Sequence, residues 1–138
     1  MKGKHLERPV FSPEQFLKYR AKFGIIPESK ILETLILLFS NRLLEQIREK
    51  HKITEIPDMF GNFGRLYVVD GTAGRVGILG GFGIGAPATV MAMEETIAYG
   101  TKKFVIVGTA GGISPDLKIG DTVVCNKSIR MKGLPIII

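Results

Sequence analysis

The pattern of hydrophobic and polar residues predicts helices and strands that alternate along the first part of the chain. Residues 12–15 read Ser-Pro-Glu-Gln, which combines a cap residue, a proline at the first helical position and a glutamine that can close a capping box. A helix is therefore expected to begin there and to end at Gly24. Residues 31–39 form an apolar run, and residues 41–50 carry apolar side chains on one helical face. We expect a buried strand over the first of these segments and a helix over the second.

The middle of the chain predicts a hairpin and then another helix. Residues 65–70 and 75–82 are rich in β-formers and flank a glycine-containing turn, which favours a hairpin with a longer loop. Residues 87–99 have helical spacing and begin with a proline, which suits a first turn. Gly100 is placed to cap the carboxyl end of this helix.

Two glycine-rich turns each follow a run of apolar β-formers. The first turn, residues 80–87, reads GGFGIGAP, and the second, residues 108–112, reads GTAGG. If residues 76–82 and 104–107 are strands joined by the helix between them, they form one right-handed βαβ unit with parallel, adjacent strands. Both turns then open at the same edge of the sheet. Because glycine lets an anion or a sugar approach backbone N–H groups, the sequence predicts a small-molecule site there.

A last strand is expected over residues 122–128, and it contains the one cysteine of the chain, Cys125. This residue cannot form an internal disulfide and is expected to be a small buried core residue, which favours a cytoplasmic protein. The basic N-terminus is followed by no apolar stretch, so no secretory signal is predicted. The apolar run at residues 31–39 is too short to span a bilayer.

Composition and charge point to one α/β domain with a small-molecule ligand. With 138 residues and 45% hydrophobic content, the chain can build one modest core but not two. The net charge of +6 arises from basic residues that are scattered along the chain, which suits an anionic small ligand or simply a solvated surface. No basic helix interleaved with aromatic residues is present, so a nucleic-acid partner is not expected.

A nicotinamide or flavin enzyme is one interpretation of the first turn. Residues 83–88, Gly-Ile-Gly-Ala-Pro-Ala, match the spacing of a dinucleotide-binding fingerprint. That fold needs an acidic residue at the end of the next strand, where this chain has Gly108, Thr109 and Ala110. The missing carboxylate and the proline inside the turn disfavour this hypothesis.

Three blocks together resemble the nucleoside phosphorylase and nucleosidase family, which includes uridine phosphorylase and hexameric purine nucleoside phosphorylase. The blocks are residues 83–87 followed by two glutamates, residues 107–113 and residues 115–124, and their order and spacing match that family. The resemblance covers roughly residues 65–133 and reaches less securely back to Ile31. It implies an α/β fold with three αβα layers and a mixed, largely parallel central sheet.

The resemblance also implies a role for the second glycine turn. In that family this turn lies under the ribose and beside a bound phosphate. By position, Gly108 and the hydroxyl and N–H groups of Thr109 are expected to bind phosphate, while Thr109, Ala110, Gly111 and Gly112 contact the nucleoside. Inorganic phosphate is then a co-substrate, and no further cofactor is expected. Gly83 of the first turn is a further candidate for the site.

Departures from the family pattern bear on the phosphate site. Many uridine phosphorylases carry a phosphate-binding arginine two residues before the glycine of the second turn, where this chain has Ile106. Nucleosidases, which use water in place of phosphate, also lack that arginine. Arg42 falls close to the first phosphate-binding arginine of the family, although the preceding glycine and aspartate are missing. An exposed helix charge is the alternative for Arg42.

Two further basic residues are candidates from the resemblance. Some family members reach into a neighbouring subunit's site with an early histidine, a position that His5 could hold, although a histidine in a basic terminus is usually only solvated. Arg130, which is followed by Met-Lys-Gly as in the phosphorylase branch, could bind phosphate or a partner chain, or lie on the surface.

The family's domain runs to about twice this length, and its later part supplies base recognition and the ribose-binding Met-Glu pair. Residues 1–138 are therefore interpreted as a single domain equivalent to the N-terminal half, with residues 1–30 as a peripheral helical extension. We expect feeble catalysis from this part alone and a homo-oligomer. The apolar end, Ile136, Ile137 and Ile138, favours coverage by another chain or a continuing domain. The hypotheses left open are phosphorylase, hydrolytic nucleosidase and a non-catalytic binding or assembly module.

Overall fold

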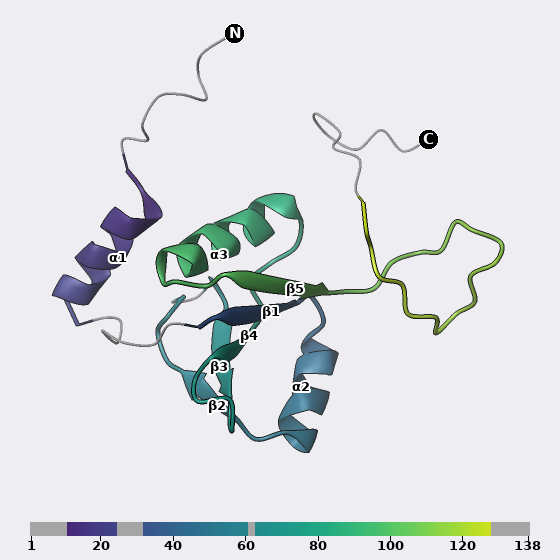
Figure 1. Cartoon of the computed structure of the whole chain (residues 1–138), viewed down its shortest axis with the longest axis horizontal. Helices are drawn as coiled ribbons and strands as arrows, with labels where there is room; N and C mark the ends of the chain where they lie inside the picture. The colour runs from purple at the N-terminus through teal and green to yellow at the C-terminus, as the bar shows by residue number, and fades with distance from the viewer. Residues whose placement is uncertain (1–10, 25–31, 61–62, 128–138) are drawn as a thin grey trace, which may run out of the picture.

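The computed structural model describes residues 11–24, 32–60 and 63–127 of the chain. In these ranges one sheet of five strands is flanked by three helices (Figure 1). The helices are α1 (Pro13–Lys22), α2 (Asn41–Lys50) and α3 (Ala86–Ala98). The strands are β1 (Thr34–Leu38), β2 (Ile53–Ile56), β3 (Arg65–Val69), β4 (Val76–Gly80) and β5 (Lys103–Val107).

The sheet is mixed, with strand order β2-β3-β4-β1-β5. β1 pairs in parallel with β4 on one side and with β5 on the other. β3 pairs antiparallel with both β2 and β4, so the expected hairpin over residues 65–82 is confirmed. The α/β class predicted from the sequence is therefore confirmed, with β4, β1 and β5 as the parallel part of the sheet.

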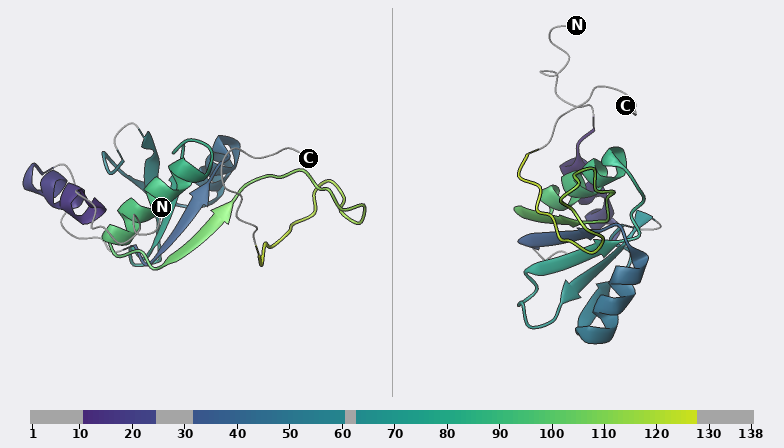
Figure 2. Two further views of the ribbon diagram at one scale, coloured as in Figure 1. Left: turned by 90° about the horizontal axis from the view of Figure 1, so that it is seen from above. Right: turned by 90° about the vertical axis from the view of Figure 1, so that its right-hand side faces the viewer.

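Side chains that alternate along the strands form two core layers, one on each face of the sheet. The first layer, under α1 and α3, includes Leu17, Leu35, Leu37, Leu66, Val68 and Ala92. The second layer, on the α2 side, consists of Leu38, Leu44, Tyr67 and Ile78 with partly buried neighbours. Figure 2 shows α2 on one side of the sheet and α3 on the other, which is the expected three-layer arrangement.

The helix ends that the capping residues predicted are present in the structure. The backbone N–H of Gln15 donates to Ser12 Oγ at 3.3 Å and the N–H of Ser12 donates to Gln15 Oε1 at 2.9 Å, so the predicted capping box at the start of α1 is present. Gly24 follows α1 with a φ of +66°, and Gly100 follows α3 with a φ of +101°. These left-handed conformations explain why each helix ends where a glycine was expected to end it.

The predicted adjacency of the two strands that carry the glycine turns is wrong. β4 and β5 are parallel to each other, but β1 lies between them. The physical reason is burial: Leu37 of β1 is 0% exposed in the core layer on one face and Leu38 is 2% exposed in the layer on the other, and a strand covered on both faces belongs at the centre of the parallel part.

The predictions for the segment after β5 are also wrong. Residues 122–127 form no strand in the structure, and Ser128, the last residue of the predicted strand, lies outside the described residues. Cys125 is exposed rather than buried. Strand propensity needs a pairing partner and a packed face to become a strand, and no described segment pairs with these residues.

Candidate functional site

Both glycine turns lie at the same edge of the sheet, as the sequence predicted. β4 ends at Gly80 and β5 ends at Val107, and both run parallel to β1, so their carboxyl ends share one edge. With one strand between them, the two turns begin about 10 Å apart. Gly83 and Gly85 in the first turn have φ values of +95° and +96°, a conformation that side chains rarely adopt.

An aromatic residue that the sequence analysis did not single out lies between the two turns. Phe39 follows β1 directly, and its ring packs against that of Phe82 with ring centroids 5.1 Å apart. A side chain added at Gly108 would meet the ring of Phe39 at 3.3 Å. Phe82 is 1% exposed, whereas Phe39 is 36% exposed. The edge between the turns therefore has an apolar floor, part of which faces solvent.

The residues of the second turn are open to solvent. Thr109, Ala110, Gly111 and Gly112 are all exposed, and an added side chain at Gly111 would meet no atom within 4 Å. Figure 1 shows residues 108–127 leaving the sheet as a loop after β5. The turn is therefore free to receive a ligand, and its proposed contacts with phosphate and nucleoside remain predictions.

Arg42 lies in the first turn of α2, just after the carboxyl end of β1. Ser40 caps this helix by accepting a hydrogen bond from the N–H of Leu43 at 3.2 Å. The side chain of Arg42 is exposed and forms no ion pair with a described residue. The positive end of a helix dipole does not stabilise a cation. Because Arg42 also has no ion-pair partner among the described residues, its guanidinium is available to an external anion. His5 and Arg130 lie outside the described residues.

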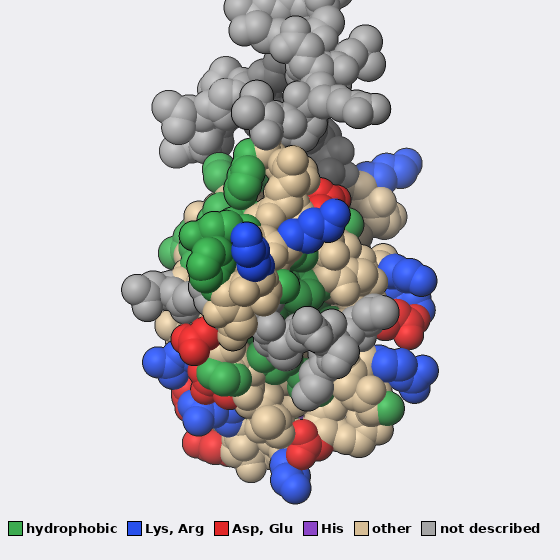
Figure 3. Space-filling view, turned by 90° about the vertical axis from the view of Figure 1, so that its left-hand side faces the viewer, with side chains coloured by type: hydrophobic (Ala, Val, Ile, Leu, Met, Phe, Trp, Pro, Cys, Tyr) green, Lys and Arg blue, Asp and Glu red, His purple; other side chains and the backbone are tan. Residues whose placement is uncertain are grey.

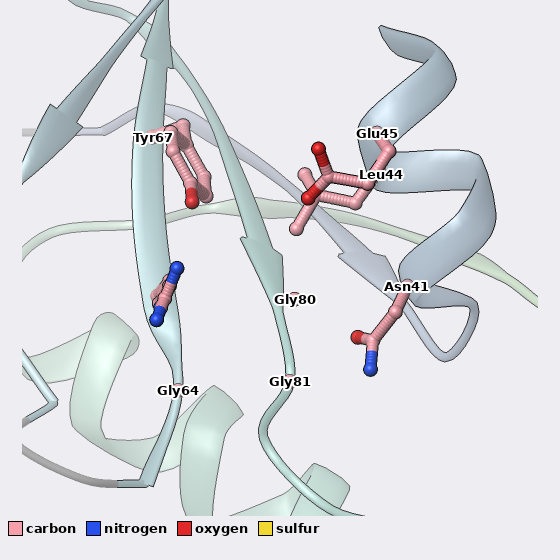
Figure 4. A pocket seen from close by; sticks show the side chains of 8 residues that line it. Asn41, Leu44, Glu45, Gly64, Tyr67, Gly80 and Gly81 are labelled. Carbon is pink, nitrogen blue, oxygen red and sulfur yellow. The ribbon is translucent and has the colours of Figure 1, made fainter. Parts of the chain in front are cut away.

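A cleft adjoins this edge on the α2 side of the sheet (Figure 4). Its volume is about 470 Å³, and its walls come from α2, from β3 and from the end of β4. The lining residues are Asn41, Leu44, Glu45, Gly64, Arg65, Tyr67, Gly80 and Gly81. Gly80 matters for its shape, because an added side chain there would lie 2.8 Å from Leu44 Cδ2.

The charges on the described surface are dispersed. On the face that Figure 3 shows, Lys and Arg side chains are spread among acidic, apolar and other residues rather than gathered in one stripe. Among the described residues, no three His, Cys, Asp or Glu side chains come together in a way that could hold a metal ion. Nor does this part of the chain contain a helix long and apolar enough to cross a bilayer.

The fold and the position of the glycine turns agree with the comparison with known families. The sequence profile of the Phosphorylase superfamily matches residues 33–135. This range includes the sheet, both glycine turns, Arg42 and the cleft, and it covers most of the chain. The chain therefore belongs to the Phosphorylase superfamily.

Curated relatives match shorter segments. The chain is 41% identical over 51 residues to uridine phosphorylase from Thermococcus kodakarensis, which covers 37% of this chain and 18% of that protein. It is 38% identical over 60 residues to uridine phosphorylase from Salmonella typhimurium, covering 44% and 24% of the two chains. It is also 47% identical over 45 residues to a DeoD-type purine nucleoside phosphorylase from Exiguobacterium sibiricum, covering 32% and 19%.

The matched segments thus span about a fifth to a quarter of the length of these relatives. No solved structure gave a significant match to the chain.

Proposed function

We propose that this chain forms the phosphate- and sugar-binding part of a nucleoside phosphorylase, which converts a nucleoside and phosphate into free base and ribose 1-phosphate. The observation that carries the proposal is the placement of two glycine turns at one carboxyl edge of the sheet in a chain of the Phosphorylase superfamily. Relatives named uridine phosphorylase and purine nucleoside phosphorylase both match, so a pyrimidine and a purine nucleoside are both candidate substrates.

The phosphate is proposed to bind where β1 and β5 end. Gly108 and Thr109 follow β5, and Arg42 follows the neighbouring strand β1, so the three residues come from adjacent strands. The exposed hydroxyl and N–H groups of Thr109 and the free guanidinium of Arg42 are the donors that an oxyanion needs.

The nucleoside is proposed to lie over Phe39, between the two turns. Ala110, Gly111 and Gly112 offer backbone groups without bulky side chains, and Gly83 borders the space from the first turn. Phosphorolysis passes through a ribosyl cation-like transition state, so an anion held beneath the sugar stabilises the charge that develops. Backbone N–H groups in glycine turns supply part of this arrangement without mobile side chains.

Hydrolytic cleavage is the second candidate function, and one observation favours it. Ile106 occupies the place where many uridine phosphorylases carry an arginine, and in β5 its side chain is 53% exposed. The loss of a bidentate guanidinium weakens phosphate binding by about 2 kcal/mol, which would suit water as the nucleophile. A module that binds nucleoside or phosphate without turnover is the third candidate. Assembly with a second copy and a cytoplasmic location are part of the proposal, as is the absence of nucleic-acid and membrane partners.

The test uses the full 138-residue chain with uridine or inosine, with and without phosphate. The products are separated by chromatography over several hours, and binding of each ligand is measured by calorimetry. Thr109→Val removes one hydroxyl while keeping the shape of the side chain. Thr122→Val, an exposed threonine of the same loop outside the glycine turn, is the matched control.

Ribose 1-phosphate that forms only with phosphate, and a loss of phosphate affinity of about tenfold in Thr109→Val but not in Thr122→Val, would support the proposal. Release of free ribose in the absence of phosphate would favour the nucleosidase. Binding of a ligand without formation of any product would favour the non-catalytic module. A chain that binds neither nucleoside nor phosphate would overturn all three.

A further inference from the structure

The cleft between α2 and the β3–β4 hairpin is lined by a buried polar group that has no partner among the residues that the structure describes. Tyr67 lies in the middle of β3 and is 2% exposed, yet its hydroxyl forms no hydrogen bond with any described residue. Figure 4 shows the ring on the side of β3 that faces α2, with the hydroxyl at the end of the ring nearer to Gly64. A buried hydroxyl without a partner is costly, so its position at the wall of a cleft points to a bound group that would satisfy it.

A free cation lies on the same side of the strand. Arg65 precedes Tyr67 by two residues in β3, and successive side chains of a strand alternate between faces, so both project toward α2. Arg65 lines the cleft, is exposed and forms no ion pair with a described residue. Figure 4 shows Asn41 at the opposite wall, and this residue is exposed. Three polar side chains therefore border one space, and two of them, the Tyr67 hydroxyl and the Arg65 guanidinium, have no partner in the described part of the chain.

The remaining charges around the cleft leave that space positive. Glu45 is the carboxylate in the lining, and Arg48 pairs with it at 3.2 Å. The guanidinium of Arg48 also lies 5.8 Å from the centre of the Tyr67 ring. The positive charge of Arg48 balances the negative charge of Glu45, so the positive charge of Arg65 is not neutralised within the lining. A guanidinium recognises oxyanions such as phosphate and carboxylate.

We propose that this cleft binds a small molecule through a phosphate or carboxylate group held by Arg65, the Tyr67 hydroxyl and the Asn41 amide. The volume of about 470 Å³ is in the range of small-molecule sites, and Leu44 with the Tyr67 ring offers apolar surface to the body of the ligand. This site is distinct from the phosphate position proposed at Thr109 and Arg42, because neither of those residues lines the cleft and β1 lies between β4 and β5. It does not depend on the proposed phosphorolysis.

The experiment titrates the full chain with inorganic phosphate, acetate and phenyl phosphate, and follows backbone amide signals by NMR. We expect at least one of the three to shift the amide signals of Arg65 and Gly81, and the comparison shows whether phosphate, carboxylate or an attached ring is preferred. Arg65→Gln and Tyr67→Phe are each expected to weaken binding about tenfold or more. Arg75→Gln, which removes an exposed arginine at the other end of β4, is the control and should leave the affinity unchanged.

Tyr67→Phe separates a binding role from a structural one. Removing an unpaired buried hydroxyl should leave the folded chain as stable as before or more stable, while ligand binding is lost. No shift at Arg65 and Gly81 with any of the three ligands would overturn the proposal, and so would an unchanged affinity in Tyr67→Phe. Shifts confined to residues 108–112 would also overturn it, while leaving the proposed function supported.

Discussion

The ring of Phe39 packs on that of Phe82, with the centroids 5.1 Å apart and the ring planes at 50° to each other. Phe39 follows the central strand β1 and Phe82 lies in the first glycine turn, so this contact joins two of the three strand ends at the candidate site. A tilted aromatic pair of this kind stabilises the folded chain by more than the burial of its apolar surface alone would give. The two rings pack beneath the glycine turns, and the ring of Phe39 stays partly exposed.

Phe39→Ala is expected to lower the free energy of unfolding by about 1–2 kcal/mol. The loss is less than for a fully buried phenylalanine because Phe39 is 36% exposed. Phe39→Leu, which keeps much of the apolar contact, should lose clearly less. Urea unfolding followed by circular dichroism measures both values, and equal losses in the two variants would show that the apolar contact kept by leucine contributes nothing.

Gly80 and Leu44 are expected to be coupled. A methyl group at Gly80 would lie 2.8 Å from Leu44 Cδ2, so Gly80→Ala should cost about 1–3 kcal/mol through overpacking of α2 against β4. Leu44→Ala alone should cost about 2–4 kcal/mol because Leu44 is 5% exposed.

The double variant tests this coupling. Removing the Leu44 side chain makes room for the new methyl group, so the two losses should add to more than the loss in the double variant. Chemical unfolding of the four proteins gives the coupling energy. If the losses in unfolding free energy of the two single variants simply add in the double variant, the Leu44 side chain can adopt another rotamer without a free-energy cost.

Arg20 is expected to hold α1 on the domain. This residue is 8% exposed, and its guanidinium donates to the backbone carbonyls of Asp58 and Met59. Arg20→Met would leave both carbonyls without this donor, so we expect a loss of about 2–3 kcal/mol and faster proteolysis within α1. Lys18→Met changes an exposed cation of the same helix and should cost less than about 0.5 kcal/mol. Similar behaviour of the two variants would exclude an anchoring role for Arg20.

Tyr99 is expected to make the protein sensitive to alkaline pH. Burial raises the pKa of its hydroxyl to about 12, with Glu95 adding to the shift and Arg20 opposing it. Between the ordinary pKa near 10 and the raised value, the unfolded chain releases this proton while the folded chain keeps it. The free energy of unfolding therefore falls as the pH rises through this window, by about 1 kcal/mol between pH 9 and pH 11 after allowance for partial exposure.

Tyr99→Phe should remove this part of the alkaline loss. Its hydroxyl is buried without a hydrogen-bond partner among the described residues, so the variant should be at least as stable as the parent chain at neutral pH. Unfolding by urea at several pH values compares the two proteins. Parallel stability curves up to about pH 11 would show that Tyr99 titrates normally.

Local signals in the sequence were sufficient for several elements. Ser12 and Gln15 specify the start of α1, and Gly24 and Gly100 specify where α1 and α3 end, because caps act through hydrogen bonds between residues a few positions apart. The hairpin of β3 and β4 was also predictable, since the glycine-containing loop of residues 70–75 joins two neighbouring runs of β-formers.

Long-range packing decided which side chains are buried. On α3 the buried residues are Thr89, Ala92 and Thr96, whereas Val90 and Ile97 are each 51% exposed. Hydropathy alone favours the opposite arrangement. The hydroxyl of Thr96 donates to backbone carbonyls of its own helix, which satisfies it without a distant partner and lets a small side chain face the sheet.

From its sequence alone, this chain determines the α/β class, the helix ends and the presence of two glycine turns at one sheet edge, because these depend on neighbouring residues and on the common direction of parallel strands. Only the tertiary structure decided that β1 separates those turns, that Phe39 lies between them and that Tyr67 faces a cleft with its hydroxyl unpaired. Strand order and burial arise from contacts between distant segments, whose free energies no local pattern records.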